Sequence, residues 1–322
     1  MRCAIGAAAL VVVLATSARA AEEAATLRVD TGRVLGTLLV PDGPGPSPVV
    51  LLIAGSGPTD RDGNNPLIPG KNDSLKLLSQ GLLSRGIGSL RYDKRGIAQS
   101  APAAPPEEQL RFETYVHDAI AWGRNLRNDP RFSSLSIVGH SEGALIGSVA
   151  ARRLPADAFV SLEGAGRAAP FLIRDQLRPQ LPPEPMAQSE SLLAELQAGR
   201  TSAAVPRGLE ALFRPSVQPY LISWFRYDPA QEIAKLRIPV LIIHGSADAQ
   251  VPFEHARILH RANPSARMMI VPGMNHVLKA VAPSDQAKQA ASLSDPTLPV
   301  VPQVFDELAA LVRSLSGATS RQ

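Results

Sequence analysis

Residues 136–147 read SIVGHSEGALIG and contain a G-x-S-x-G sequence centred on Ser141. The pattern predicts a buried apolar strand before this pentapeptide and an alanine-rich helix after it. A serine on such a sharp turn exposes its hydroxyl, and the N-terminus of the helix directs free amides and a positive dipole end towards it. Gly139 and Gly143 let the helix begin close to neighbouring backbone. This context favours Ser141 as a nucleophile over a chance turn of the same composition.

Apolar runs and helical periodicity alternate on both sides of this stretch. Buried strands are predicted at 49–55, 87–93, 135–139, 158–164, 238–245 and 266–273. Helices are predicted at 74–86, 111–129, 141–154, 253–263 and 301–315. Such alternation is typical of a mostly parallel sheet with helices on both faces. We therefore predict an α/β fold, preceded by a hairpin of strands around Thr31 and Gly32, with a long loop at 279–299.

One segment, residues 167–228, interrupts the alternation. It contains helical pieces, several prolines and an aromatic-rich end, VQPYLISWFRYDP. We interpret it as a helical insertion above the sheet. The remaining core then consists of residues 21–166 and 229–322.

A catalytic serine needs a base that removes its proton and an acid that orients the base. Asp248 and His276 each lie just past the end of a predicted strand. Because the carboxyl ends of parallel strands meet at one edge of the sheet, both side chains are expected to approach Ser141 there. Glu163 also follows a strand and is a rival acid, although we favour Asp248.

Residues 51–65, LLIAGSGPTDRDGNN, lead from a strand into glycines and acids and suggest several kinds of site. The dinucleotide-binding pattern fails because Asp60 stands where a third glycine is needed, and the P-loop pattern fails at Asn72. The pattern of a calcium-binding loop fits from Asp60 onwards. It then fails, because Asn65 stands where the pattern requires glycine and Lys71 stands where it requires its final glutamate. Only a non-standard calcium site stays open.

The same loop suits an oxyanion hole, in which two backbone amides stabilise the negative oxygen of a tetrahedral intermediate. One amide belongs to the residue after the nucleophile, here Glu142, and the other to the loop after an earlier strand. The polar residues that follow the glycines are predicted to hold the loop by hydrogen bonds: Asp60, Arg61, Asp62 and Asn64.

Residues 1–20 have the layout of a secretory signal peptide, with an apolar run and an Ala18-Arg19-Ala20 cleavage site. We expect cleavage after Ala20 and therefore a secreted or periplasmic protein. No stable membrane anchor is expected after cleavage, since the apolar run is shorter than the ~20 residues that span a bilayer. The single cysteine, Cys3, would be removed. The net charge of +4 includes no run of basic residues, which argues against a nucleic-acid partner.

These stretches together resemble the α/β-hydrolase superfamily, in particular the serine hydrolases called serine aminopeptidase-like or monoacylglycerol-lipase-like. The matching pieces, spread over roughly residues 26–318, are IAGSGPTDRDGN, LRYDKRGIAQS, VGHSEGA, IPVLIIHGSADAQVP and PGMNH. The resemblance implies an α/β-hydrolase fold and a Ser141–Asp248–His276 triad. It places the second oxyanion amide on Ser56, with Ala54 where the family's loop has histidine.

The resemblance also implies that 167–228 is a lid, whose Tyr220, Trp224 and Phe225 are candidate walls of an apolar substrate pocket. We expect no cofactor and no metal. We expect a serine hydrolase of small-molecule carboxylic esters. The alternatives are a peptidase or amidase that acts on small peptides or amides, and a non-catalytic member of the fold that binds a ligand. The sequence leaves the natural substrate and the oligomeric state open.

Overall fold

The computed structural model describes residues 21–319, so the predicted signal segment 1–20 lies outside the described part. The strands are β1 (Ala21–Val29), β2 (Gly32–Val40), β3 (Ser47–Ile53), β4 (Gly88–Tyr92), β5 (Phe132–His140), β6 (Ala158–Leu162), β7 (Val240–Gly245) and β8 (Arg267–Val271). The helices of the core are α1 (Ser74–Leu83), α2 (Phe112–Arg127), α3 (Glu142–Ala151), α8 (Pro229–Ala234), α9 (Glu254–Ala262), α10 (Gln286–Ser292) and α11 (Pro302–Thr319). Every predicted strand and helix is present in this list.

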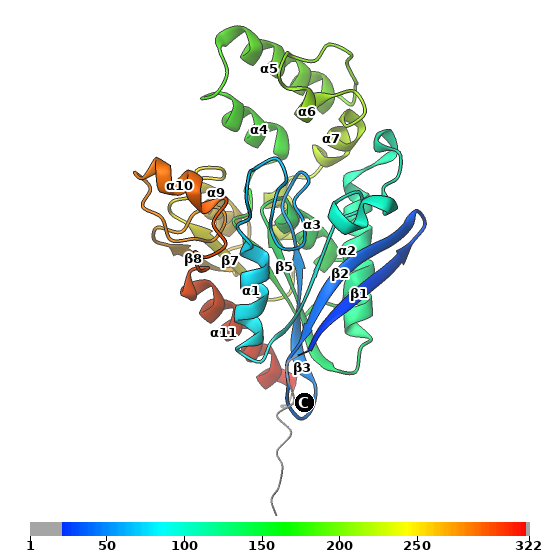
Figure 1. The fold of residues 1–322 in the computed structure, drawn as a ribbon, viewed down its shortest axis with the longest axis vertical. Coiled ribbons are helices and arrows are strands. Elements are labelled where there is room, and N and C mark those ends of the chain that lie inside the picture. Colours follow the sequence, from blue (N-terminus) through cyan, green and yellow to red (C-terminus); the bar gives the residue numbers. More distant parts are fainter. Residues whose placement is uncertain (1–20, 320–322) are drawn as a thin grey trace, which may run out of the picture.

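The described strands form a single eight-stranded sheet in the order β1-β2-β4-β3-β5-β6-β7-β8 (Figure 1). The predicted hairpin is confirmed: β1 pairs with β2 antiparallel, with Val29 opposite Gly32. β2 also pairs with β4 antiparallel, whereas all pairs from β4 to β8 are parallel. The carboxyl ends of the parallel strands therefore meet at one edge, as the alternation of strands and helices requires.

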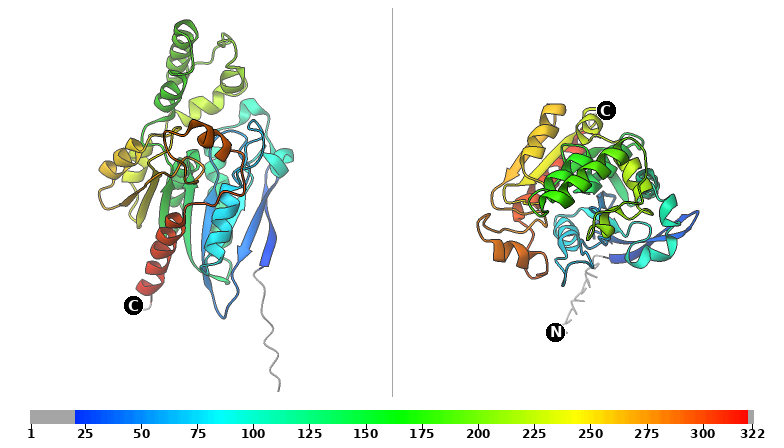
Figure 2. Two further views of the ribbon diagram at one scale, coloured as in Figure 1. Left: turned by 60° about the vertical axis from the view of Figure 1, so that its left-hand side comes forward. Right: turned by 90° about the horizontal axis from the view of Figure 1, so that it is seen from above.

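The two faces of the sheet carry separate hydrophobic cores. In β3, Val49, Leu51 and Ile53 face the core that includes α2 and α3, while Val50 and Leu52 face the core that includes α1 and α11. Successive side chains of a strand point to opposite faces. The continuous apolar runs of the sequence are therefore explained by helices on both faces, which Figure 2 shows from two further sides.

The segment 167–228 folds into helices beyond the carboxyl ends of the strands (Figure 1). These are α4 (Ala169–Leu177), α5 (Pro183–Gln197), α6 (Glu210–Phe213) and α7 (Gln218–Trp224). Among residues 21–319, no helix is both long enough and apolar enough to cross a membrane.

Two short α-helices of the core were not predicted. α8 begins after Asp228, whose side chain accepts the Gln231 amide, and α10 begins after Asp285, whose side chain accepts the Lys288 amide. Both aspartates are N-caps, which satisfy amides that a helix leaves free at its start. The prediction of a continuous loop over 279–299 was wrong at α10, because seven residues carry too little apolar periodicity to reveal a helix.

Candidate active site

Ser141 lies on a tight turn between β5 and α3. Its backbone has φ 56° and ψ −121°, a conformation that is costly for a residue with a side chain. The flanking glycines make the turn sterically possible. A Cβ on Gly143 would lie 2.2 Å from the Ile53 carbonyl oxygen, and a Cβ on Gly139 would lie 2.0 Å from the Gly143 carbonyl oxygen. The turn therefore requires both glycines and presents Ser141 at the carboxyl edge of the sheet.

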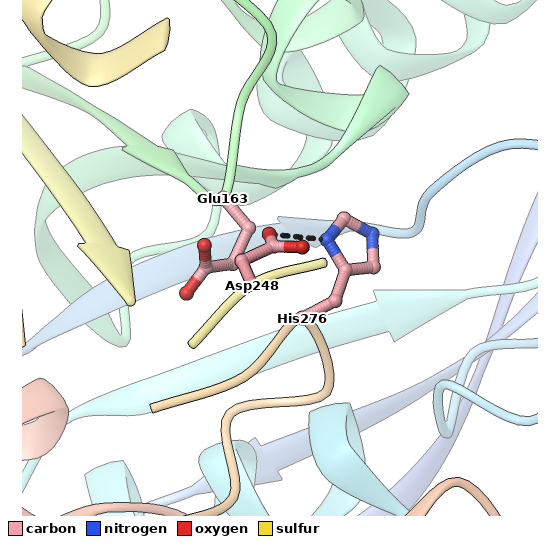
Figure 3. Close-up of side chains that lie close together, drawn as sticks. All are labelled: Glu163, Asp248 and His276. Atoms are coloured by element: carbon pink, nitrogen blue, oxygen red, sulfur yellow. Dashed lines mark hydrogen bonds and ion pairs between the residues drawn. The ribbon is translucent and has the colours of Figure 1, made fainter. Parts of the chain in front are cut away.

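Asp248 and His276 meet at the same edge (Figure 3). His276 Nδ1 lies 2.7 Å from Asp248 Oδ2, and both residues are buried. The other carboxylate oxygen of Asp248 accepts the amides of Gln250 and Val251 at 2.8 and 2.9 Å. The imidazole is thus held by a carboxylate that is itself held by backbone.

The environment of Asp248 favours its charged form. Burial acts to raise its pKa, but the charge and hydrogen bond of His276 oppose it, together with hydrogen bonds from Glu163 and the Val251 amide. These interactions outweigh burial and lower the pKa of Asp248 below its usual range. Asp248 is therefore ionised at neutral pH and able to stabilise a positive imidazole.

Glu163, the rival acid, lies beside Asp248 but does not hydrogen-bond the imidazole. It is completely buried, and its Oε1 accepts the Gly245 amide at 2.9 Å. Burial first and the Asp248 charge second raise the pKa of Glu163 well above its usual range. Glu163 therefore favours its neutral, protonated form beside the ionised Asp248. The sequence predicted that Glu163 lies at this edge of the sheet, but no sequence pattern indicated its protonation state.

Glu163, Asp248 and His276 are also close enough to ligate a metal ion, with donor atoms within 4.8 Å of one another. However, Asp248 already bonds the imidazole. A carboxylic acid that keeps its proton is a poor metal ligand, because metal binding requires the deprotonated form. The cluster is better explained by the Asp248–His276 hydrogen bond with the buried Glu163 packed beside it.

The Glu163→Gln variant tests this protonation state. It keeps a neutral side chain of the same shape and removes the ability to ionise. Because the pKa of Glu163 is raised in the folded protein, the native state binds a proton that the unfolded chain loses above about pH 4.3. The free energy of unfolding of the wild type should therefore fall with rising pH, relative to the variant, by up to about 1.4 kcal/mol per pH unit until the native Glu163 also ionises.

Denaturant titrations of both proteins between about pH 5 and pH 8 measure this difference. Parallel pH profiles would mean that Glu163 has the same protonation state in the folded and unfolded chains, which contradicts a protonated Glu163 in the folded protein.

His140 lies beside His276. Its Nε2 lies 2.7 Å from the His276 carbonyl oxygen, and the two rings are 4.8 Å apart. Burial first and the nearby His276 second lower the pKa of His140 to about 3. The neutral ring therefore donates its Nε2 proton to the carbonyl and fixes the loop that carries His276. Sequence reasoning missed this contact, since neighbours on a turn usually point apart.

The loop after β3 approaches the serine closely. A Cβ on Gly55 would lie 3.1 Å from the Ser141 Cβ, so a side chain there would crowd the nucleophile. Within residues 21–319, neither the Ser56 amide nor the Glu142 amide donates to a protein acceptor. Both predicted oxyanion donors are therefore free to bind a substrate oxygen.

The polar residues after these glycines bond to the protein. Asp60 accepts the amides of Asp62 and Asn64 at 2.9 and 2.8 Å, and the Asp62 carboxylate pairs with Arg91 at 2.7 Å. Arg61 pairs with Asp93 at 2.6 Å. These contacts tie the loop to itself and to β4. These contacts thus explain the polar residues of the loop that suggested a calcium site.

A cavity of about 680 Å³ opens above the serine. Ser141, His276, Ser56 and Glu142 all line it, so the predicted nucleophile, base and oxyanion donors face one space.

Of the predicted pocket walls on α7, Tyr220 and Trp224 line this cavity, one helical turn apart. Phe225 does not line the cavity, so the prediction that it forms a pocket wall was wrong. It follows the last residue of the helix and packs against the hydrophobic core.

The profile of the Alpha/beta hydrolase family matches residues 50–292. The chain is similar to Esterase EstD of Thermotoga maritima, with 27% identity over 256 residues, which are 76% of this chain and 57% of that protein. The match thus spans little more than half the length of this curated relative.

Solved structures share the fold at low sequence identity. Est1E from Butyrivibrio proteoclasticus is 16% identical, with a TM-score of 0.54 over 84% of this chain and 96% of that one. A proline iminopeptidase of Mycobacterium smegmatis is 16% identical, with a TM-score of 0.58 over 92% of this chain and 100% of that one. With the turn at Ser141 and the mostly parallel sheet, the family match shows that this chain belongs to the alpha/beta hydrolase family.

Proposed function

We propose that this protein is a serine hydrolase that cleaves carboxylic esters through an acyl-enzyme. The observation that carries the proposal is the buried Asp248–His276 hydrogen bond at 2.7 Å, with Ser141 facing the same cavity as His276. The similarity to an esterase of Thermotoga maritima supports the ester class.

In the proposed acylation step, Ser141 Oγ attacks the ester carbonyl carbon while His276 takes the hydroxyl proton. The carbonyl π electrons move to its oxygen, and the free amides of Ser56 and Glu142 bind that oxygen. The ionised Asp248 orients His276 and stabilises its cation. Collapse of the intermediate breaks the bond to the alcohol oxygen, which receives the proton from His276.

In the deacylation step, His276 takes a proton from water, and the hydroxide attacks the acyl carbon. The second tetrahedral intermediate binds the same two amides. Its collapse releases the carboxylic acid and returns the proton to Ser141. No additional reactant is needed besides water.

The charges in the cavity favour an ester over a substrate with a free amino group. The carboxylates among the described lining residues are Glu107 and Glu142. Glu107 pairs with Arg214 at 2.9 Å, and Glu142 pairs with Lys94 at 2.9 Å. Recognition of a cationic amine by either carboxylate would require breaking an ion pair. The volume of about 680 Å³ lies within the range of small-molecule sites.

The function is tested by assaying the protein against nitrophenyl esters of rising acyl length and a panel of aminoacyl anilides. We expect turnover of the esters and at least tenfold lower kcat/KM for the anilides. Faster turnover of anilides would favour the peptidase alternative. Labelling of Ser141 by a fluorophosphonate without turnover of either panel would leave the nucleophile intact and the substrate class wrong. Absence of both labelling and turnover would favour a non-catalytic binding protein.

A further inference from the structure

Lys94 carries a buried ammonium group close to the nucleophile turn. It follows strand β4, and its side chain is 1% exposed. Its Nζ donates to the Gly55 carbonyl oxygen at 2.6 Å and to Glu142 Oε2 at 2.9 Å. The Tyr115 ring centroid lies 4.9 Å away. A buried charge is costly unless it is paired and hydrogen-bonded, and these two acceptors belong to the two segments that carry the free amides.

The first contact fixes the direction of the Ser56 amide. The carbonyl of Gly55 and the N–H of Ser56 belong to one planar peptide group, which is trans like every described peptide bond. In a trans peptide, the C=O and N–H point in opposite directions. An ammonium that holds the Gly55 oxygen therefore holds the Ser56 N–H towards the other side. Ala54, where the family's loop has histidine, has no polar group for this task.

The second contact restrains the residue that carries the other amide. Glu142 is the first residue of α3, and its carboxylate is 2% exposed. One carboxylate oxygen bonds Lys94, and the other accepts the hydroxyl of Tyr220 on α7. Glu142 therefore cannot rotate without breaking buried hydrogen bonds.

We propose that Lys94 is a positioning residue of the oxyanion hole, whose ammonium holds the Gly55–Ser56 peptide and the Glu142 side chain so that both free amides face the substrate's carbonyl oxygen. The inference rests on the proposed function, because it assigns Lys94 a part in the same ester hydrolysis. It predicts an effect on the transition state, where the oxygen is charged, rather than on substrate binding.

The Lys94→Met variant tests it, since methionine fills similar space without a donor. We expect kcat for a nitrophenyl ester to fall by about 10- to 100-fold, with KM within about threefold of the wild type. Rates are counted per active site, titrated with a fluorophosphonate, so that unfolded molecules do not contribute. If the wild type itself does not turn over any ester, the proposed function fails. If the wild type is active and Lys94→Met keeps its kcat, this inference alone fails.

Lys279→Met is the matched control. Lys279 is also completely buried, and its ammonium also donates to a backbone carbonyl, that of Leu298. It does not line the cavity. This variant should lose stability and keep kcat per active site. An equal loss of kcat in both variants would reduce the role of Lys94 to general stability, and a rise in KM at constant kcat would make it a substrate-binding residue. Either result overturns the proposal.

Lys94→Met leaves the Glu142 carboxylate buried without its cation, which is destabilising. If that variant does not fold, Lys94→Met/Glu142→Gln removes both charges together. The same drop in kcat at nearly constant KM is expected from it. A kcat within threefold of the wild type in this folded double variant would equally overturn the proposal.

Discussion

The Ser141→Ala variant is expected to lose ester hydrolysis by at least about four orders of magnitude in kcat while keeping its fold. The reason is chemical, because alanine has no atom that can form the acyl-enzyme. The structure adds a reason for the retained fold. Ser141 is half-buried and lines the cavity, so the loss of its hydroxyl leaves no void in the hydrophobic core. The measurement is the initial rate with a nitrophenyl ester, alongside the melting temperature and fluorophosphonate labelling.

Ser148→Ala is the matched control for this variant. Ser148 lies on α3, seven residues after Ser141, is buried and donates its hydroxyl to the Leu145 carbonyl at 2.9 Å. It does not line the cavity above the nucleophile. Removing this hydroxyl should leave kcat and labelling intact. Hydrolysis that persisted in Ser141→Ala but not in Ser148→Ala would refute Ser141 as the nucleophile.

The sequence was most informative where local sterics dictate the residue type. The glycines at 139 and 143 are required because any side chain there would meet backbone at about 2 Å. The apolar runs identified the strands because both faces of the sheet are covered. Asp248 and His276 could be placed together because they follow strands that are neighbours, β7 and β8. In each case, a local pattern and the sheet topology lead to the same position.

The sequence was least informative where function depends on contacts between distant segments. The pKa of Glu163 is raised because the group is buried beside Asp248, 85 residues further along the chain, and no local pattern contains that information. Lys94 meets Gly55 and Glu142 only once β4, β3 and β5 are side by side. Phe225 was grouped with Tyr220 and Trp224 by composition, but it follows the last residue of the helix and does not line the cavity. Partners of this kind follow from tertiary packing.

The second large effect is expected for Asp248→Asn, which should lower kcat by about 10⁴-fold. An ionised carboxylate at 2.7 Å selects the imidazole tautomer that carries its proton on Nδ1, which leaves Nε2 free to accept the serine proton. The amide of asparagine can donate to Nδ1 and select the opposite tautomer. It also lacks the negative charge that stabilises the imidazolium. Steady-state kinetics with the ester and a melting curve measure both consequences.

Asp157→Asn separates this effect from the loss of a well-bonded carboxylate in general. Asp157 accepts the Leu135 amide at 2.7 Å and pairs with Arg127 at 2.6 Å, but it precedes β6 and so lies at the opposite end of the strands from His276. Its substitution should lower the melting temperature and leave kcat unchanged. If Asp248→Asn instead kept kcat within tenfold of the wild type, Glu163 would have to supply the charge. Adding Glu163→Gln to that variant would then abolish the remaining activity, whereas a neutral Glu163 predicts no further loss.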